Sequence, residues 1–532
     1  IMEMALDKLG LAMQSWMNNH FNLATFFYDV VKANSKSAAL RYVDSTVSYS
    51  ELNFLSNKVA NYFKSLDIEP YDSVGIFNTK GLAGYTAMLA CLKLGVTYTN
   101  IDEDNPSSRI ENILHCCNPK LLISDHQPSK KIKDTAKRAK IKLVNIGSDE
   151  LLAGFCGKDL DISLEITGDT PAYVMFTSGS TGIPKGVTVS HDNLLSFIKW
   201  SINRFDVTPS DRFAQLSPMY FDNSVFDFYT GLFSGASLVP ISKSITKKPL
   251  EVIKLVDRFK CTVWFSVPSF LVYLLTMRVL TKDTFQSIRT FIFGGEGFPK
   301  GELKKIYNLY SDRSKLVNVY GPTEGTCICS SYDVTEKDFM DMNTLAPLGI
   351  INQNFSYMIV DENMESVKIG EKGELCLVGP NVAIGYYNDF ARTSENFVQN
   401  PLIKTHKNIV YRCGDLVYEK EGLLWFAGRT DNQIKHMGYR IELEEIESAL
   451  NGIDLVSQSA VLYERVKVNY GKIIAFVATK SNVTETEIKK CLEFLLPKYM
   501  IPGIIIIKES LPKNPNGKID RKQLLKLHID NK

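Results

Sequence analysis

Short apolar runs alternate with segments of helical periodicity along most of this chain. Four runs, 73–77, 120–124, 262–265 and 290–293, have the length and the near-continuous apolar character of buried strands. Segment 302–310, after the last of these runs, carries apolar residues at helical spacing. This alternation predicts the α/β class, with layered sheets covered by helices.

The pattern changes near residue 430. After a turn-like polar stretch at 428–431, helical patterns at 441–450 and about 484–495 enclose strand-like segments at 459–463 and 472–479. Such a set of elements is sufficient for a small α+β domain.

We therefore expect two domains, with the boundary at Asp431. Residues 1–430 are predicted to form a large N-terminal domain of layered α/β subdomains, and residues 431–532 a small, mobile C-terminal domain.

Composition excludes several classes of function. The 532 residues include 61 basic and 59 acidic side chains, a balance that gives no reason to expect nucleic acid as a partner. The apolar run at 504–507 is far too short to span a bilayer, so we expect no membrane insertion. The ten cysteines show no paired C-x-x-C spacing, which argues against zinc and favours reduced thiols in a cytoplasmic enzyme.

The strongest chemical signal lies in segment 173–187. A strand-like run leads into a loop with three glycines, several hydroxyl side chains and one lysine. Glycines let backbone N–H groups close around an anion, hydroxyls donate to phosphate oxygens, and a lysine adds charge. An ordinary solvated loop is the alternative. The candidate phosphate-binding residues are Thr177, Ser178, Gly179, Ser180, Thr181, Gly182 and Lys185.

The complete pattern resembles the phosphate loop of the adenylate-forming superfamily. That superfamily includes acyl-CoA synthetases, luciferases and the adenylation domains of nonribosomal peptide synthetases. The resemblance continues over nearly the whole chain, at segments 318–324, 373–387, 411–416, 428–443 and 514–521. It implies ATP and Mg²⁺ as cofactors.

The resemblance also implies roles for individual residues around the nucleotide. Tyr320 would stack on the adenine and Asn318 would hold its edge, while Asp415 and Arg429 would bind the ribose. Further implied nucleotide contacts are Gly295, Glu296 and Gly321, with Thr323 on the α-phosphate and Glu324 binding Mg²⁺.

Two further roles follow from the same resemblance. Asp431 would be the hinge about which the small domain rotates between two half-reactions, with Gly438 along the path of the thiol. Lys518 would be the mobile catalytic lysine, together with Thr323 and Glu324; by itself, a lysine near a C-terminus is usually a solvated charge.

Segment 216–226 indicates which acid is activated. It resembles the amino-acid-binding segment of nonribosomal adenylation domains, in which an aspartate, here Asp222, pairs with the substrate α-ammonium. The alternative is that Asp222 caps a helix. The other implied pocket residues are Asn223, Phe226, Ser266, Ile292, Gly294, Val319, Cys327 and Ile328.

These pocket residues carry no charge, so we expect a small or medium amino acid with an apolar or weakly polar side chain. Val319 and Phe226 would limit the depth of the pocket, and Gly294 would leave room on one wall. Asn223 and Ser266 could bind one hydroxyl or amide of the substrate.

The function predicted is ATP-dependent formation of an aminoacyl-AMP with release of pyrophosphate, followed by transfer to the phosphopantetheine thiol of a carrier protein. No carrier segment follows Arg521, so we expect the carrier to act in trans. Alternatives are a D-alanine–carrier protein ligase, an acyl- or aryl-CoA ligase, and an inactive adenylate-binding module. Asp222 argues against the CoA ligase, and the intact set Lys185, Glu324, Asp415 and Lys518 argues against the inactive module.

Overall fold

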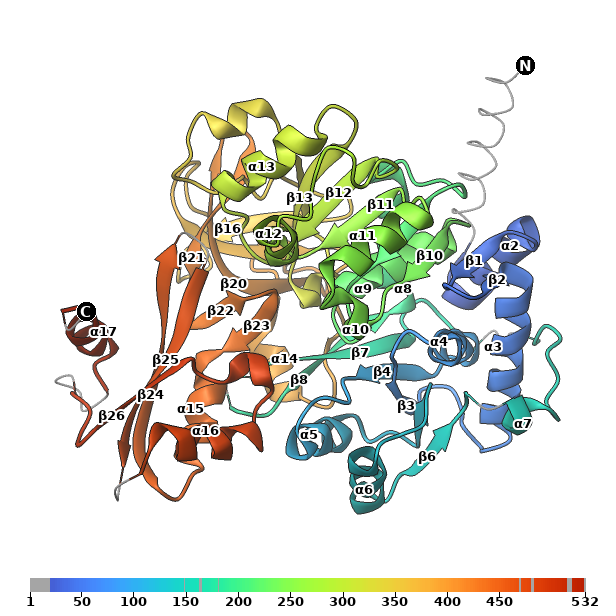
Figure 1. The fold of residues 1–532 in the computed structure, drawn as a ribbon, viewed down its shortest axis with the longest axis horizontal. Helices are drawn as coiled ribbons and strands as arrows, with labels where there is room; N and C mark the ends of the chain where they lie inside the picture. Colours follow the sequence, from blue (N-terminus) through green and yellow to red (C-terminus); the bar gives the residue numbers. More distant parts are fainter. Residues whose placement is uncertain are drawn as a thin grey trace.

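A computed structural model provides the coordinates of this chain (Figure 1). Its described residues form five sheets. The structure describes residues 20–147, 149–161, 165–179, 181–467, 470–479, 483–513 and 519–530.

A seven-stranded sheet contains the first two predicted strands. Its central strands are parallel and fully or largely buried, as their near-continuous apolar sequences require. In spatial order the strands are β18 (Gly385–Tyr386), β8 (Lys185–Ser190), β7 (Pro171–Thr177), β4 (Thr97–Ile101), β3 (Ser73–Phe77), β5 (Leu121–Ser124) and β6 (Lys142–Asn145).

A nine-stranded sheet contains the other two predicted strands. Its interior is parallel, and antiparallel strands close both edges. The order is β15 (Ile350–Ile351), β14 (Ser330–Asp333), β13 (Lys315–Tyr320), β12 (Thr290–Gly294), β11 (Val263–Ser266), β9 (Arg212–Gln215), β10 (Ser237–Pro240), β1 (Ala38–Arg41) and β2 (Thr46–Ser48).

The two faces of the nine-stranded sheet support different apolar cores. Along β12, Ile292 belongs to a core shared with the seven-stranded sheet, whereas its neighbours Phe291 and Phe293 belong to the core beneath the outer helices. The first core includes α2 (Leu23–Asn34), α3 (Tyr49–Lys64), α4 (Leu82–Leu94) and α8 (His191–Arg204), and the second includes α11 (Pro249–Arg258), α12 (Pro268–Thr276) and α13 (Lys300–Tyr310).

A third, antiparallel sheet connects these layers to the C-terminal part. It is formed by β16 (Ser356–Val360), β17 (Gly373–Val378), β20 (Ile409–Lys420), β19 (Phe397–Gln399) and β21 (Leu423–Arg429). Further helices are α5 (Ser107–Cys117), α6 (Lys130–Ala139), α7 (Asp149–Leu152), α10 (Lys243–Thr246) and α14 (Phe390–Asn396).

Residues after β21 build a hairpin and a three-stranded sheet with a core of their own. That core draws on residues between Ile441 and Ile505. The elements are β22 (Gln433–His436), β23 (Tyr439–Glu442), α15 (Leu443–Asn451), β24 (Val456–Lys467), β25 (Tyr470–Thr479), α16 (Glu485–Glu493), β26 (Ile504–Lys508) and α17 (Arg521–Asp530).

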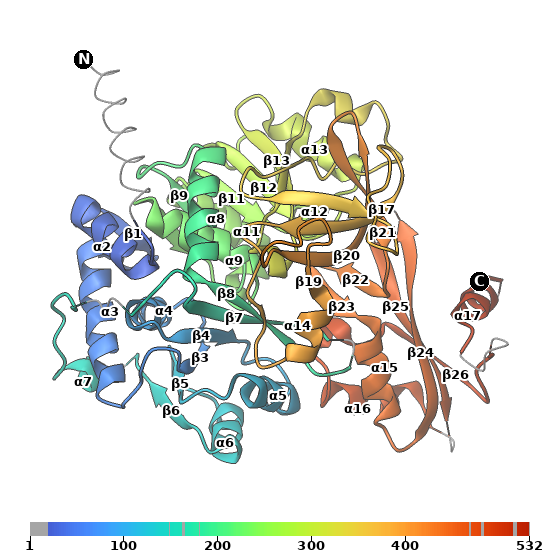
Figure 2. The same cartoon turned by 180° about the vertical axis from the view of Figure 1, so that it is seen from behind.

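Seen from both sides, the C-terminal part lies at one end of the molecule and α2 and α3 at the other (Figures 1 and 2). The predicted α/β class, with a large N-terminal and a small C-terminal domain, is confirmed. Its boundary at Asp431 stays a prediction. One difference is local: the helix expected over 441–450 begins at Leu443, because residues 439–442 pair with β22 instead. Within the described ranges, no helix has the length and apolar character needed to cross a membrane.

Candidate functional site

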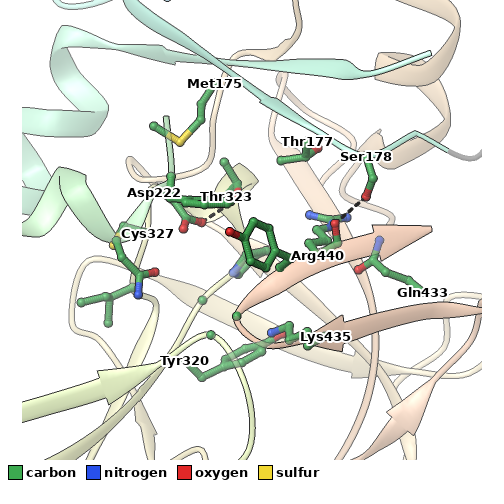
Figure 3. Close-up of a pocket in the computed structure, with 18 of the residues that line it drawn as sticks. Met175, Thr177, Ser178, Asp222, Tyr320, Thr323, Cys327, Gln433, Lys435 and Arg440 are labelled. Atoms are coloured by element: carbon green, nitrogen blue, oxygen red, sulfur yellow. Dashed lines mark hydrogen bonds between the residues drawn. The ribbon is translucent and has the colours of Figure 1, made fainter. Parts of the chain in front are cut away.

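A cavity lies where strand ends of the large domain meet the β22–β23 hairpin. The carboxyl ends of β7 and β13 lead into Thr177–Ser178 and Gly321–Thr323, and the hairpin contributes Lys435, Tyr439 and Arg440. Ligand sites of α/β folds commonly lie beyond the carboxyl ends of strands. Figure 3 shows side chains from all three segments converging on this space.

Asp222 faces this cavity and does not act as a helix cap. The short helix α9 (Asn223–Val225) begins after it, but the Asp222 side chain makes no capping hydrogen bond to the described backbone. Its Oδ2 instead accepts a hydrogen bond of 2.7 Å from the Thr323 hydroxyl, as Figure 3 shows. Burial raises the pKa of the Asp222 carboxyl. A carboxyl group is therefore held in the cavity wall, where a cationic partner would favour its charged form.

The structure brings half of the other predicted pocket residues to the cavity wall. Asn223, Val319, Cys327 and Ile328 line it. The lining of the cavity does not include the other four, which are Phe226, Ser266, Ile292 and Gly294.

Each of these four is engaged elsewhere. Phe226 and Ile292 are fully buried in the apolar core. Ser266 accepts a hydrogen bond from the Trp264 indole, because β-strand side chains alternate and place Phe265 on the cavity side. At Gly294 a Cβ atom would lie 2.5 Å from the Val319 carbonyl oxygen. Val319 fills the space beside Gly294, which corrects the expectation of room for substrate there.

Sequence reasoning missed several residues of the wall. Met175 and Phe265 supply apolar surface, and Tyr220, Phe221 and Pro322 lie close to Asp222 and Thr323 in sequence. Met175 lies two residues before Thr177 on β7, so the period of two could have placed it on the same face as Thr177. The aromatic pair at 220–221 could have been found by its position beside Asp222.

Glu324 lies at the centre of a charged cluster beside the cavity. Its carboxylate is fully buried and accepts hydrogen bonds from Arg440 at 2.7 Å and from the Tyr386 hydroxyl at 2.8 Å. The Lys185 ammonium is 3.5 Å away. Burial alone would raise the pKa of the Glu324 carboxyl, but the Arg440 and Lys185 charges hold it far below its usual value. Burial lowers the pKa of Lys185 to about 8.

The predicted adenine and ribose residues are also brought together. The Tyr320 hydroxyl donates to Asp415, whose carboxylate also pairs with Arg429. The Lys435 ammonium lies 5.2 Å from the centroid of the Tyr320 ring, at the edge of the cavity seen in Figure 3. Asn318, in contrast, donates its amide to the Pro347 carbonyl oxygen.

Residues of the loop after β12 contact the tip of the hairpin. Glu296 accepts a hydrogen bond of 3.0 Å from the Gly438 N–H and another of 2.7 Å from the Ser269 N–H. Gly295 has a φ of +91°, and a Cβ at Gly321 would lie 2.3 Å from the Cys327 carbonyl oxygen, so both positions depend on glycine.

The candidate phosphate loop is in contact with the C-terminal part. The Ser178 hydroxyl donates to the Arg440 carbonyl oxygen and accepts from the Glu442 N–H, and the Gly179 N–H donates to Glu445. Thr181 accepts from Arg392. Gly182 has a φ of +82°, and the Thr177 hydroxyl has no hydrogen-bond partner among the described residues.

Two predicted site residues, Ser180 and Lys518, lie outside the described residues. The predicted hinge, Asp431, lies between β21 and β22, and its carboxylate accepts two hydrogen bonds of 2.6 Å from Arg429. In the described ranges no group of three or more His, Cys, Asp or Glu side chains could hold a metal ion.

Comparisons with known proteins find similarity over most of the chain. A family model described as AMP-binding enzyme matches residues 27–387, and one described as AMP-binding enzyme C-terminal domain matches residues 445–518. The D-alanine--D-alanyl carrier protein ligase of Bacillus cereus (strain Q1) is 31% identical over 491 residues, covering 91% of this chain and 94% of that protein. The ligase of the same name from Bacillus licheniformis is 32% identical over 489 residues, covering 90% and 94%.

Solved structures share the fold. The Vibrio cholerae adenylation domain AlmE, in complex with glycyl-adenosine-5'-phosphate, is 25% identical with a TM-score of 0.80 and covers 97% of this chain and 99% of its own. PA1221, a nonribosomal peptide synthetase protein containing adenylation and PCP domains, is 23% identical with a TM-score of 0.81, covering 96% and 85%.

Proposed function

Because this chain belongs to the family of AMP-binding enzymes, we propose that it activates an amino acid as an aminoacyl-AMP and transfers the aminoacyl group to the phosphopantetheine thiol of a carrier protein. The observation that carries the proposal is the half-buried Asp222 carboxylate in the wall of the cavity. It is the group that selects an amino acid over a simple carboxylic acid.

Electrostatics explain this selection. The α-ammonium of an amino acid neutralises Asp222 inside the cavity. A fatty or aromatic acid would leave that carboxylate unpaired in a desolvated site, at a cost of several kcal/mol. The surrounding wall of Met175, Phe265, Val319 and Ile328 is apolar and has no charge to offer a substrate side chain.

Adenylation joins two anions. A carboxylate oxygen of the amino acid forms a bond to the α-phosphorus of ATP while the bond to the pyrophosphate oxygen breaks, so the site must supply fixed donors and positive charge. In our proposal the donors and the positive charge come from Thr323, the 177–182 loop and Lys185. The ribose is held by Asp415 and Arg429. Lys518 bridges the two reacting groups. An adenine stacked on the Tyr320 face now covered by Lys435 would displace that lysine.

The residues present fit Mg²⁺ at Glu324. Glu324 is a single buried carboxylate, now paired with Arg440 and Lys185. It would serve as one oxygen ligand to a cation that takes its remaining ligands from phosphates and water. When bound, Mg²⁺ would neutralise phosphate charge. Arg440 would have to leave Glu324 first, which requires movement of the hairpin.

The second half-reaction suits the arrangement described here. The hairpin tip lies against the large domain, with the Gly438 N–H on Glu296. We propose that Gly438 borders the path by which the carrier thiol reaches the adenylate. The thiol sulfur then forms a bond to the carbonyl carbon as AMP leaves.

D-alanine is the substrate that we favour within this class. The relatives from Bacillus carry D-alanine in their names, and they align with nine-tenths of this chain. Val319 occupies the space beside Gly294, which leaves a short pocket suited to a small side chain.

Pyrophosphate exchange tests the proposal directly. The enzyme would be assayed with each common amino acid in both enantiomers, and with fatty and aromatic acids. We expect exchange with a small amino acid, D-alanine first. Exchange with fatty or aromatic acids alone would indicate a CoA ligase, and no exchange with any acid would indicate an inactive module.

A further inference from the structure

A buried ion pair joins the two parts of the chain beside the phosphate loop. Arg109, in the first turn of α5, is 7% exposed, and Glu445, in the first turn of α15, is 2% exposed. The Arg109 guanidinium donates to Glu445 Oε1, while Glu445 Oε2 accepts a hydrogen bond of 3.2 Å from the Gly179 N–H. One carboxylate is therefore held by a guanidinium and a loop amide together.

This coordination resembles that of a bound phosphate. Backbone N–H groups of a glycine-rich loop and an arginine are the donors that proteins use for phosphate oxygens, and a carboxylate presents the same planar pair of acceptors to a guanidinium. Arg109 also lines the cavity that contains Thr177 and Ser178. The Glu445 carboxylate thus lies where a phosphate of a nucleotide would meet this loop.

Removing Glu445 from the loop would change the charge of the site. Among the described residues Glu445 is the only hydrogen-bond partner of the Arg109 guanidinium. If the C-terminal part rotates away, a buried guanidinium is left without its counter-charge beside open loop N–H groups. Such a charge is costly unless another anion takes its place.

We propose that Arg109 and the Gly179 N–H form an anion subsite for the pyrophosphate end of ATP, and that Glu445 occupies this subsite when the C-terminal part is docked. The inference rests on the proposed function, in which ATP binds at this loop. It assigns Arg109 to substrate binding and makes Glu445 an internal competitor of ATP. Docking of the C-terminal part and binding of the triphosphate then exclude each other.

The two partners are therefore expected to have opposite effects on nucleotide binding. Glu445→Gln removes the competitor and should tighten Mg·ATP binding about three- to tenfold, because a larger fraction of the protein is competent to bind. Arg109→Gln removes a charged donor to phosphate and should weaken Mg·ATP binding about ten- to a hundredfold. AMP lacks the pyrophosphate end, so its affinity should be the same in Arg109→Gln as in the wild type.

Isothermal titration calorimetry of the full chain with Mg·ATP and with AMP measures these effects. Glu444→Gln is the matched control, since Glu444 lies on the same helix but accepts from Asn432 and does not contact the loop. Arg109→Lys is a second variant, expected to regain part of the Mg·ATP affinity.

A purely structural ion pair predicts a different outcome. Arg109→Gln and Glu445→Gln would then shift Mg·ATP affinity in the same direction, or Arg109→Gln would weaken AMP and ATP equally, and either result overturns the subsite. Binding of Mg·ATP without exchange for any amino acid would contradict the proposed function instead, and leave the subsite to be judged by the two variants.

Discussion

Two ionisable side chains, the half-buried Asp222 and the fully buried His191, show how the surroundings of a single residue set chemistry and stability. Asp222 is held in the cavity wall by the Thr323 hydroxyl. His191 begins α8 and is fully buried, and its Nδ1 accepts a hydrogen bond of 3.0 Å from the Leu23 N–H. The first is expected to act on substrate and the second only on the fold.

Replacement of Asp222 by asparagine should abolish recognition of the α-ammonium. Loss of one partner of a buried charge pair costs about 3–5 kcal/mol, which corresponds to a fall in kcat/KM for the amino acid of at least about a hundredfold. Pyrophosphate exchange measures this value, and calorimetry with AMP should show unchanged nucleotide affinity.

The pH dependence of the wild-type enzyme should follow from the same group. Because burial raises the pKa of Asp222, the carboxylate loses its charge at a higher pH than an ordinary aspartate, and kcat/KM should decline as the pH is lowered. An exchange rate in Asp222→Asn that matches the wild type would contradict the assignment.

His191 should make the fold sensitive to acid. Burial lowers the pKa of His191 from 6.5 to about 3. Between these two pH values the His191 ring binds a proton in the unfolded chain but not in the folded chain. The contribution of neutral His191 to the free energy of unfolding is fully present above pH 6.5 and declines as the pH falls towards 3. At pH 5 the free energy of unfolding is lower by about 2 kcal/mol for this reason.

Urea denaturation of wild type and His191→Gln at pH 7 and pH 5 measures this contribution. The variant should be less stable at pH 7, because it loses the fit of the buried ring, but it should lose about 2 kcal/mol less between the two pH values. The exposed His115 on α5 provides the control variant His115→Gln, which should keep the wild-type pH dependence. Equal pH dependence in all three proteins would contradict the role of His191.

At the level of elements, the β22–β23 hairpin is the one that completes the site. Its tip is the dipeptide Met437–Gly438, with φ values of +52° and +80°, which is the turn geometry that best matches the twist of a two-residue hairpin. A Cβ atom at Gly438 would lie 2.6 Å from Val267 Cγ1. The tip can therefore approach the large domain only if residue 438 has no side chain.

The substitution Gly438→Ala tests the hairpin as an element. Backbone strain at positive φ costs about 1–2 kcal/mol, so docking should weaken and carrier aminoacylation should slow about tenfold or more. Pyrophosphate exchange should change less than about twofold, since adenylation does not need the docked hairpin. Gly452→Ala at the end of α15, where a Cβ meets only ordinary contacts of 3.5 Å, is the control. Equal slowing of both reactions would contradict this role.

At the scale of the whole molecule, the arrangement described here is specific to one of the two proposed half-reactions. Arg440 donates a hydrogen bond to Glu324, and Glu445 accepts one from the Gly179 N–H. The Lys435 ammonium lies over the Tyr320 ring. Three groups of the C-terminal part thus stand where Mg²⁺, phosphate and adenine would lie in our proposal. Adenylation then requires the C-terminal part to move as a body.

Asp431→Pro tests that movement. Asp431 links β21 to β22, and proline there restricts φ and removes the carboxylate that accepts from Arg429. Carrier aminoacylation needs both arrangements of the C-terminal part in every turnover, whereas pyrophosphate exchange needs only the undocked one. We therefore expect aminoacylation to slow at least about tenfold more than exchange, measured on the same preparation. Asp431→Asn, which keeps backbone freedom, should separate loss of the carboxylate from loss of rotation. Parallel slowing of both reactions in the proline variant would contradict a hinge at this residue.

Periodicity along the chain was sufficient to predict several of the elements, because the burial pattern of a strand or helix repeats over a few residues and can be read from a short segment. The strands at 73–77 and 290–293 and the helix at 302–310 are found as expected. The family resemblance carried by the motifs implied one site containing Thr177, Asp222 and Tyr320, and all three residues line the cavity.

What only the tertiary structure decided is which side chains share the space between those motifs. Ser266 was expected in the pocket, but its side chain points to the other face of β11 and Phe265 lines the cavity instead. Arg109 and Glu445 are 336 positions apart and carry no local pattern that relates them. Periodicity reports on neighbours within one element, whereas a site between two parts of a chain depends on how those parts pack, and that information exists only in three dimensions.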